Sequence, residues 1–347
     1  MAYPGRQSDG RIRLVIMQQF ITGADIGAVK NQYTGGFVVA HFSGDPAWDW
    51  NNLDHASAAK LLAGQLPGVD ASSIETFGSG DFCLAFRLRG QVFRVARHAE
   101  AAEALQRESC ILSKIAPILP LPVPQPAYHA PHGCPSFTVH KEITGEFLTR
   151  ETWEGMPTPA RERAASDLAA FLKSLHALPI ELGLECRLMQ IEAAEIARGL
   201  REETANTIQR SLGHETQQKL DRTLKRWSSQ PSPRRPALLH RDMGPGHVLY
   251  DPSTLQLTGV IDFGDIVIGD PARDFIYIYE DFGPRLLQEV LAPYAGKDAW
   301  KMMPAIRKWY LLDAISWTIG MYVEGREADL DHGLAEIQRE LANVPIL

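Results

Sequence analysis

The sequence predicts an α+β fold in two lobes, the first an antiparallel sheet with one helix and the second mostly helical. Strand-like runs and turn glycines crowd residues 74–95. Apolar residues at helical spacing follow over residues 99–115 and 158–178, and again in much of the remaining chain. With 347 residues, the chain is also long enough to form two hydrophobic cores.

The individual elements follow from these patterns in chain order. Residues 12–17 and 37–42 resemble short strands, and Asp54 is a plausible cap for a helix over 54–66. A glycine-bearing hairpin over 74–88 is expected next, then a strand at 92–95 and a helix at 99–115. Seven prolines within 117–135 leave room only for short edge strands. The remaining expected elements are a strand at 136–143, a helix at 158–178, two helices within 187–228 that separate near Gly213, and strands at 237–239, 247–250 and 257–261.

The composition is that of an ordinary globular protein, with 45% hydrophobic and 22% charged residues. No apolar run approaches the length that spans a membrane, and no signal segment is recognisable at the start. The four cysteines lack the paired spacing of metal ligands. We therefore expect reduced, mostly buried thiols in a cytoplasmic protein that does not bind membranes.

The negative charge is concentrated at the C-terminal end. The chain carries a net charge of −7, and residues 262–347 hold 15 acidic and 8 basic side chains. Such an acidic region favours a cationic small molecule as ligand and disfavours nucleic acid. A merely solvated acidic surface is the alternative explanation.

Two carboxylates stand out within residues 240–274. Asp242 lies in a His-Arg-Asp motif after the apolar run 237–239, and Asp262 lies in Ile-Asp-Phe-Gly after 257–261. Phosphoryl transfer commonly uses one aspartate to orient the attacking hydroxyl and take its proton, and a second to hold Mg²⁺ on the phosphates. We expect Asp242 to be the base and Asp262 the metal ligand. A capping or turn aspartate is the alternative for Asp242.

The motifs HRDMGPGH, IDFGD and DPARDF together resemble the catalytic core of the aminoglycoside phosphotransferases. The resemblance is greatest to the branch that phosphorylates the two-double-prime hydroxyl, with macrolide phosphotransferases next. It implies a bilobal protein-kinase-like fold, with an extension of unknown role at 1–51, an N-lobe at 52–143 and a C-lobe at 144–347. It also implies that His247, five residues after Asp242, joins Asp262 as a ligand of Mg²⁺.

The resemblance further implies how ATP or GTP is bound. The hairpin glycines would cover the phosphates, although a cysteine replaces the third glycine of the motif. A cation on the following strand would clamp phosphate oxygens, aimed by an ion pair with a helix glutamate. A surface arginine and a solvated helix glutamate are the alternatives, and Glu103 competes for the second role. The expected nucleotide-binding residues are Gly78, Ser79, Gly80, Arg94, Glu108, and by position the Lys141 carbonyl and Ile143 amide.

Acidic residues late in the chain are candidates for binding the ammonium groups of an aminoglycoside: Glu280, Asp281 and Asp313. Each has the alternative role of a solvated helix charge. Asp274 is instead expected to be structural, tying back to the catalytic loop. A macrolide or another small hydroxylated metabolite is the alternative acceptor, and a nucleotide-binding pseudokinase that acts as an interaction module is the alternative of another class. We expect a monomer or weak dimer.

Overall fold

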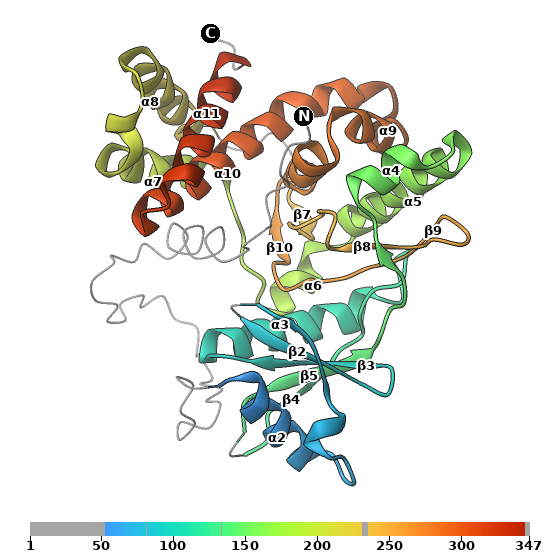
Figure 1. Ribbon diagram of the computed structural model, residues 1–347. Helices are drawn as coiled ribbons and strands as arrows, with labels where there is room; N and C mark the ends of the chain where they lie inside the picture. The colour runs from blue at the N-terminus through green and yellow to red at the C-terminus, as the bar shows by residue number, and fades with distance from the viewer. Residues whose placement is uncertain (1–52, 81, 133, 231–234, 344–347) are drawn as a thin grey trace. The chain divides into compact units, whose positions relative to one another are not determined.

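The computed structural model describes residues 53–80, 82–132, 134–230 and 235–343 (Figure 1). The strands expected at 12–17 and 37–42 lie outside these ranges. The described chain folds into two compact units. The sheet unit comprises residues 53–188 and 244–266, and the helical unit comprises residues 189–243 and 267–343. The sequence predicts that the first lobe ends at residue 143, whereas the sheet unit continues to residue 188. The predicted lobe boundaries stay a prediction.

The sheet unit contains two antiparallel sheets. Its strands are β1 (Glu75–Ser79), β2 (Cys83–Leu88), β3 (Gln91–Ala96), β4 (Ala127–His129), β5 (Phe137–Lys141), β6 (Glu146–Phe147), β8 (Val248–Asp251) and β9 (Gln256–Val260). Its helices are α2 (His55–Gln65), η2 (Ala71–Ser73), α3 (Ala99–Ile115), α4 (Arg150–Gly155), α5 (Thr158–Ala177) and α6 (Ile180–Glu185). The larger sheet has the order β1-β2-β3-β5-β4, and the smaller has the order β6-β8-β9.

The larger sheet is covered by a different helix on each face. Because side chains alternate along a strand, Phe93 and Val95 of β3 point to one face and Arg94 and Ala96 to the other. Phe93 and Val95 join a core that includes the α2 residue Leu62. Ala96 joins a separate core with residues of α3. The alternation therefore directs Arg94 toward α3.

Helix α3 has the length and register that its apolar pattern predicts. It spans Ala99–Ile115, and the His98 side chain accepts a hydrogen bond from the Ala101 amide at its start. A disulfide joins Cys110 of this helix to Cys186 at the end of α6. The expectation that every cysteine is a reduced thiol is therefore wrong for this pair, because folding brings together two residues that are 76 positions apart.

The smaller sheet depends on two glycines for close backbone approach. Gly145 has a φ of +151°, and a Cβ there would contact the Thr258 hydroxyl and lie 2.9 Å from the Tyr250 carbonyl oxygen. A Cβ on Gly259 would lie 2.7 Å from both the Pro122 carbonyl oxygen and Ile143 Cγ2. Larger residues would therefore separate β8 and β9 from the segment that follows β5.

The helical unit has only a two-stranded antiparallel sheet within the described residues, β7 (Ala237–Leu239) with β10 (Val267–Gly269). Its helices are α7 (Ala193–Asn206), η3 (Ile208–Ser211), α8 (His214–Ser228), η4 (Pro271–Phe275), η5 (Ile278–Phe282), α9 (Pro284–Ala295), η6 (Gly296–Met302), α10 (Met303–Glu324) and α11 (Glu327–Asn343). Helices α7 and α8 are the two expected within 187–228, and Gly213 precedes α8 as predicted.

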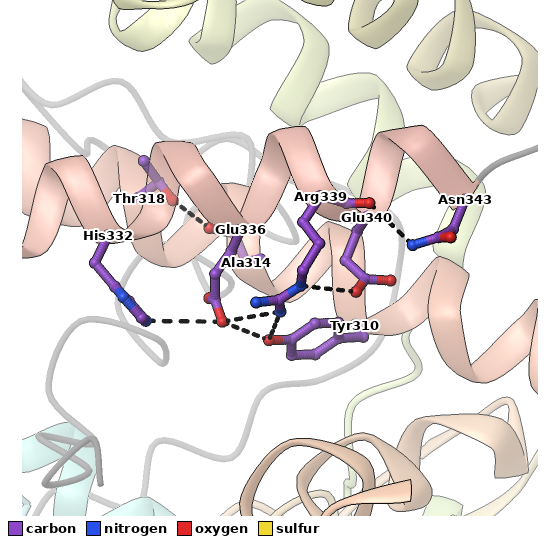
Figure 2. Close-up of polar contacts among 8 residues, drawn as sticks. All are labelled: Tyr310, Ala314, Thr318, His332, Glu336, Arg339, Glu340 and Asn343. Carbon is purple, nitrogen blue, oxygen red and sulfur yellow. Dashed lines mark hydrogen bonds and ion pairs between the residues drawn. The ribbon is translucent and has the colours of Figure 1, made fainter. Parts of the chain in front are cut away.

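Helices α10 and α11 of the helical unit pack against each other, and polar groups lie between them. Figure 2 shows Tyr310, Glu336 and Arg339 directed toward one another. The Tyr310 hydroxyl donates to Glu336 Oε1 at 2.8 Å, and Arg339 Nη2 donates to the same oxygen at 3.3 Å. A Cβ on Gly333 would lie 3.0 Å from Thr318 Cβ, so the two helices are in close contact. Within the described ranges, every helix is too short or too polar to span a bilayer.

Candidate active site

In the sheet unit, a buried ion pair joins β3 to α3. Arg94 Nη1 donates to both carboxylate oxygens of Glu108, at 2.6 and 2.7 Å. The Glu108 side chain is 3% exposed and that of Arg94 is 20% exposed. Glu103, the competing candidate, instead contacts Arg107 at 3.4 Å on the solvent side of the same helix. The expected pairing of Arg94 with Glu108 is thus present, and its role in phosphate binding stays a prediction.

The same guanidinium reaches Asp262. Arg94 Nη2 lies 3.2 Å from Asp262 Oδ1, so one arginine contacts two carboxylates on different elements. Burial lowers the pKa of Arg94, but the attraction of Glu108 and Asp262 outweighs it and the net shift is upward. The guanidinium is consequently a permanent cation. A forked group is required for this geometry, which distinguishes Arg94 from a lysine at the same position.

Asp262 and His247 lie side by side because they flank two paired strands. His247 precedes β8 and Asp262 follows β9, and the Ile261 amide donates to the His247 carbonyl at 2.9 Å. His247 Nε2 consequently lies 3.7 Å from Asp262 Oδ2. Asp262 has a φ of +62°, which is uncommon for a residue with a side chain and is typical of functional sites. Phe263 is fully buried and packs edge-on against Phe171 of α5, which fixes the turn.

The glycine hairpin forms as expected between β1 and β2, with a register shift between Thr76 and Gly78. The Gly80 amide donates to the Cys83 carbonyl at 2.9 Å, so in this conformation it serves the hairpin. Burial raises the pKa of the Cys83 thiol to about 11, which keeps this residue neutral. The predicted binding of phosphates by Gly78, Ser79 and Gly80 stays a prediction.

Two side chains that the sequence does not single out hold the carbonyls of this hairpin. Arg97 Nη1 donates to the Gly80 carbonyl at 2.9 Å, and His55 Nε2 lies 3.4 Å from the Gly78 carbonyl. Both come from outside the glycine motif, and neither belongs to a recognisable pattern. They restrict the hairpin on either side of Ser79.

The predicted hinge follows β5. The Glu142 amide donates to the Gly90 carbonyl at 2.9 Å, and β5 ends at Lys141. The Lys141 carbonyl accepts a hydrogen bond from His140 Nδ1 at 2.9 Å. A carbonyl oxygen accepts two hydrogen bonds, so this contact leaves Lys141 able to bind a base. The roles of Lys141 and Ile143 in binding the nucleotide base stay predictions.

In the helical unit, the His-Arg-Asp segment follows β7, and its backbone is hydrogen-bonded to the side chain of Asp274. Asp274 is 1% exposed and accepts hydrogen bonds from the amides of His240 and Arg241, at 2.9 and 2.6 Å. The Asp242 amide donates to His240 Nδ1 at 3.2 Å. Asp274 therefore binds the backbone of the predicted catalytic loop, as expected. The buried His240 has a structural role, since its side chain accepts a hydrogen bond from the Asp242 amide. The Asp242 side chain is left half-buried.

Asp313, a predicted substrate carboxylate, is buried in an ion pair. Its side chain is 2% exposed, and Asp313 Oδ1 pairs with Arg273 Nη2 at 2.9 Å. The Tyr277 hydroxyl also donates to this carboxylate, at 3.4 Å. This face of α10 is inside the core, so Asp313 is paired with Arg273 in this structure, and its predicted role in binding the acceptor stays a prediction. Arg273 is the residue that the sequence interpretation missed; an arginine within the apolar stretch DPARDFIYIY was the available signal.

Glu280 and Asp281 lie in η5, a single π-helical segment between η4 and α9. Both side chains are half-buried. Such π-helical segments are rare and often occur at functional sites. The predicted role of these residues in binding the acceptor stays a prediction, and the helix type is consistent with it.

Asp262 and His247 are the residues that would hold Mg²⁺. Among the described residues, no group of three or more His, Cys, Asp or Glu side chains is arranged to bind a metal ion. Mg²⁺ often takes only one or two protein ligands and completes its octahedral shell with phosphate oxygens and water. Asp262, with its side chain 49% exposed, and the adjacent His247 fit that mode of binding.

Comparisons with known proteins agree with this fold. The phosphotransferase enzyme family matches residues 85–309. An aminoglycoside 3'-phosphotransferase of Streptomyces fradiae is 27% identical over 194 residues, which cover 51% of this chain and 67% of that protein. The GDP and kanamycin complex of APH(2")-IIia is similar in structure, with a TM-score of 0.72 and 25% identity over 82% of this chain and 98% of that one. A macrolide 2'-phosphotransferase of Brachybacterium faecium shares the fold, with a TM-score of 0.59 and 16% identity over 80% and 95%.

Proposed function

Because the chain belongs to the phosphotransferase enzyme family, we propose that it transfers the γ-phosphate of ATP or GTP to a hydroxyl of an aminoglycoside-type antibiotic, and so confers resistance. The observation that carries the proposal is the contact of Arg94 with both Glu108 and Asp262. A cation fixed by a buried helix carboxylate, beside a carboxylate at a strand end, is the arrangement with which kinases of the protein-kinase type transfer phosphate. The relatives named as aminoglycoside phosphotransferases support the acceptor class.

Phosphate binding is assigned to the sheet unit. Arg94 neutralises phosphate oxygens with its second guanidinium nitrogen, while Glu108 holds the first. The glycine hairpin covers the phosphates, and Arg97 restrains its tip through the Gly80 carbonyl. The base of ATP or GTP is recognised by the backbone at Lys141 and Ile143.

Asp262 and His247 are the residues that would hold Mg²⁺. A bound Mg²⁺ neutralises the charge that develops on the phosphate oxygens. Before nucleotide binds, Arg94 balances the charge of the Asp262 carboxylate at 3.2 Å. The hydrogen bond from the Ile261 amide to the His247 carbonyl fixes the separation of His247 from Asp262. Both side chains are therefore already close to each other before Mg²⁺ binds.

Asp242 is assigned as the base. A hydroxyl is a weak nucleophile, and in a loose transition state an aspartate contributes mainly by orienting it and accepting its proton late. The hydrogen bonds that Asp274 accepts from the His240 and Arg241 amides hold the backbone that carries Asp242. Glu280 and Asp281 supply negative charge for the ammonium groups of the acceptor.

The proposal is tested with a panel of acceptors and radiolabelled ATP or GTP. Kanamycin-type and gentamicin-type aminoglycosides, a macrolide and a simple amino alcohol are each incubated with protein and Mg²⁺. We expect labelled product with at least one aminoglycoside. Labelled product with the macrolide alone would show that the acceptor is a macrolide and not an aminoglycoside. Absence of transfer to every acceptor in the panel would contradict the proposal.

A further inference from the structure

The residue immediately before the proposed base has a strained backbone. Arg241 has a φ of +73°, a conformation in which side-chain-bearing residues are uncommon. It is 4% exposed, so solvent does not stabilise its backbone groups. Residues in such conformations persist only when the surrounding structure holds them. The contacts of Arg241 should therefore identify what fixes the position of Asp242.

Both backbone groups of Arg241 are held by one turn of η4. Its amide donates to Asp274 Oδ1 at 2.6 Å, and its carbonyl accepts from Arg273 Nη1 at 3.4 Å. Arg273 and Asp274 are consecutive residues, so a single rigid segment fixes both peptide groups that flank Arg241. The second of these groups is the Arg241–Asp242 peptide itself.

Arg273 is in turn fixed by α10. Its Nη2 donates to Asp313 Oδ1 at 2.9 Å, and both side chains are 2% exposed. Tyr277 adds its hydroxyl, which donates to Asp313 Oδ1 at 3.4 Å. A guanidinium is planar, so anchoring Nη2 to Asp313 also sets the direction of Nη1 toward the Arg241 carbonyl. Buried ion pairs are weak contributors to net stability, which leaves specific positioning as a reason for this pair.

We propose that Arg273, anchored by Asp313, is a positioning residue that fixes the Arg241–Asp242 peptide and so directs the Asp242 carboxylate. The inference rests on the proposed role of Asp242 as the base. It assigns to Asp313 a function in catalysis that operates through Arg273 and not through contact with substrate.

The test replaces the ion pair by apolar residues of similar size. Arg273→Met/Asp313→Leu removes both charges together, a change that often leaves stability intact. Arg273→Lys is the second variant; it keeps a cation beside Asp313 but lacks the fork that reaches the carbonyl. The control is Arg201→Gln/Asp221→Asn, which removes an ion pair of 2.7 Å on the surface of the same unit, with side chains 43% and 47% exposed.

Three quantities are measured on the full chain: the melting temperature, kcat and KM for nucleotide, and hydrogen exchange of the peptide that contains residues 240–243. We expect both Arg273 variants to exchange several-fold faster at this peptide than wild type. We expect their kcat to fall roughly 10- to 100-fold, because a small misplacement of a catalytic group has effects of this size. KM for nucleotide should change less than about twofold, and the control should match wild type in all three.

Unchanged exchange in the variants would overturn the inference, and so would faster exchange with wild-type kcat. If the double variant fails to fold, Arg273→Lys gives the same comparison. If wild type transfers no phosphate to any acceptor while exchange still increases in the variants, the proposed function fails and the restraint on the Arg241–Asp242 peptide stands. The exchange measurement therefore separates the two conclusions.

Discussion

Replacing Glu108 by glutamine tests the ion pair on which the nucleotide site depends. The substitution preserves shape and one acceptor oxygen but removes the charge opposite Arg94. Two hydrogen bonds to a charged acceptor, of 2.6 and 2.7 Å, become one hydrogen bond to a neutral amide oxygen. The guanidinium remains charged and largely buried, with 20% of its side chain exposed.

The expected loss of stability follows from the remaining contacts. Removing one partner of a fully buried ion pair commonly costs about 3–5 kcal/mol. Arg94 keeps Asp262 at 3.2 Å and is partly exposed, so Glu108→Gln should lower the free energy of unfolding by about 2–3 kcal/mol. Arg94 also loses the contact that fixes its direction. KM for nucleotide should therefore rise about tenfold, equivalent to about 1.4 kcal/mol.

The measurement pairs chemical denaturation with steady-state kinetics, and α3 supplies a matched control. Glu103→Gln makes the same chemical change five residues earlier, where the carboxylate is 65% exposed and 3.4 Å from Arg107. Exposed pairs contribute at most about 1 kcal/mol, so this variant should resemble wild type. Equal stability and equal KM in the Glu108→Gln and Glu103→Gln proteins would refute the reasoning.

Three other changes have expected outcomes. Gly145→Ala should lower the free energy of unfolding by about 2–4 kcal/mol because its Cβ would meet β8 and β9, whereas Gly155→Ala, which has open space, should be neutral or stabilising. Both are measured by denaturation. Reducing the disulfide between α3 and α6, which links residues 76 positions apart, should lower the free energy of unfolding by ~4 kcal/mol. If all four cysteines of the unfolded protein were alkylated without a reductant, the bond would be absent. Glu280→Gln/Asp281→Asn should raise KM for an aminoglycoside and leave KM for nucleotide unchanged, and an unchanged acceptor KM would exclude these carboxylates from the acceptor site.

Much of the local structure could be predicted from the sequence. Glycine spacing and alternating apolar residues indicate the β1–β2 hairpin, and helical periodicity defines α3 at its observed bounds. The tie from Asp274 to the catalytic loop was implied by resemblance and is present. These features depend on short stretches of sequence or on a motif whose parts lie 34 residues apart.

The rest depends on contacts that no local pattern encodes. Asp313 looks like a candidate for binding cations until tertiary packing places it against Arg273, 40 residues earlier. The disulfide joins two helices in a chain whose cysteine spacing indicates no pairing. The left-handed backbone conformation of Arg241 also cannot be predicted from the sequence, because arginine has no preference for it. Each feature is set by long-range packing that overrides local preference.

We propose that Asp242 and Asp262 serve one phosphoryl transfer. The most direct test is a crystal structure of the protein with Mg²⁺, a non-hydrolysable nucleotide and an aminoglycoside. We predict a metal ion bound by Asp262 and His247, with an Asp242 carboxylate oxygen within hydrogen-bond distance of an acceptor hydroxyl that faces the γ-phosphate. A nucleotide bound away from Asp262, or an acceptor hydroxyl out of reach of Asp242, would contradict the account.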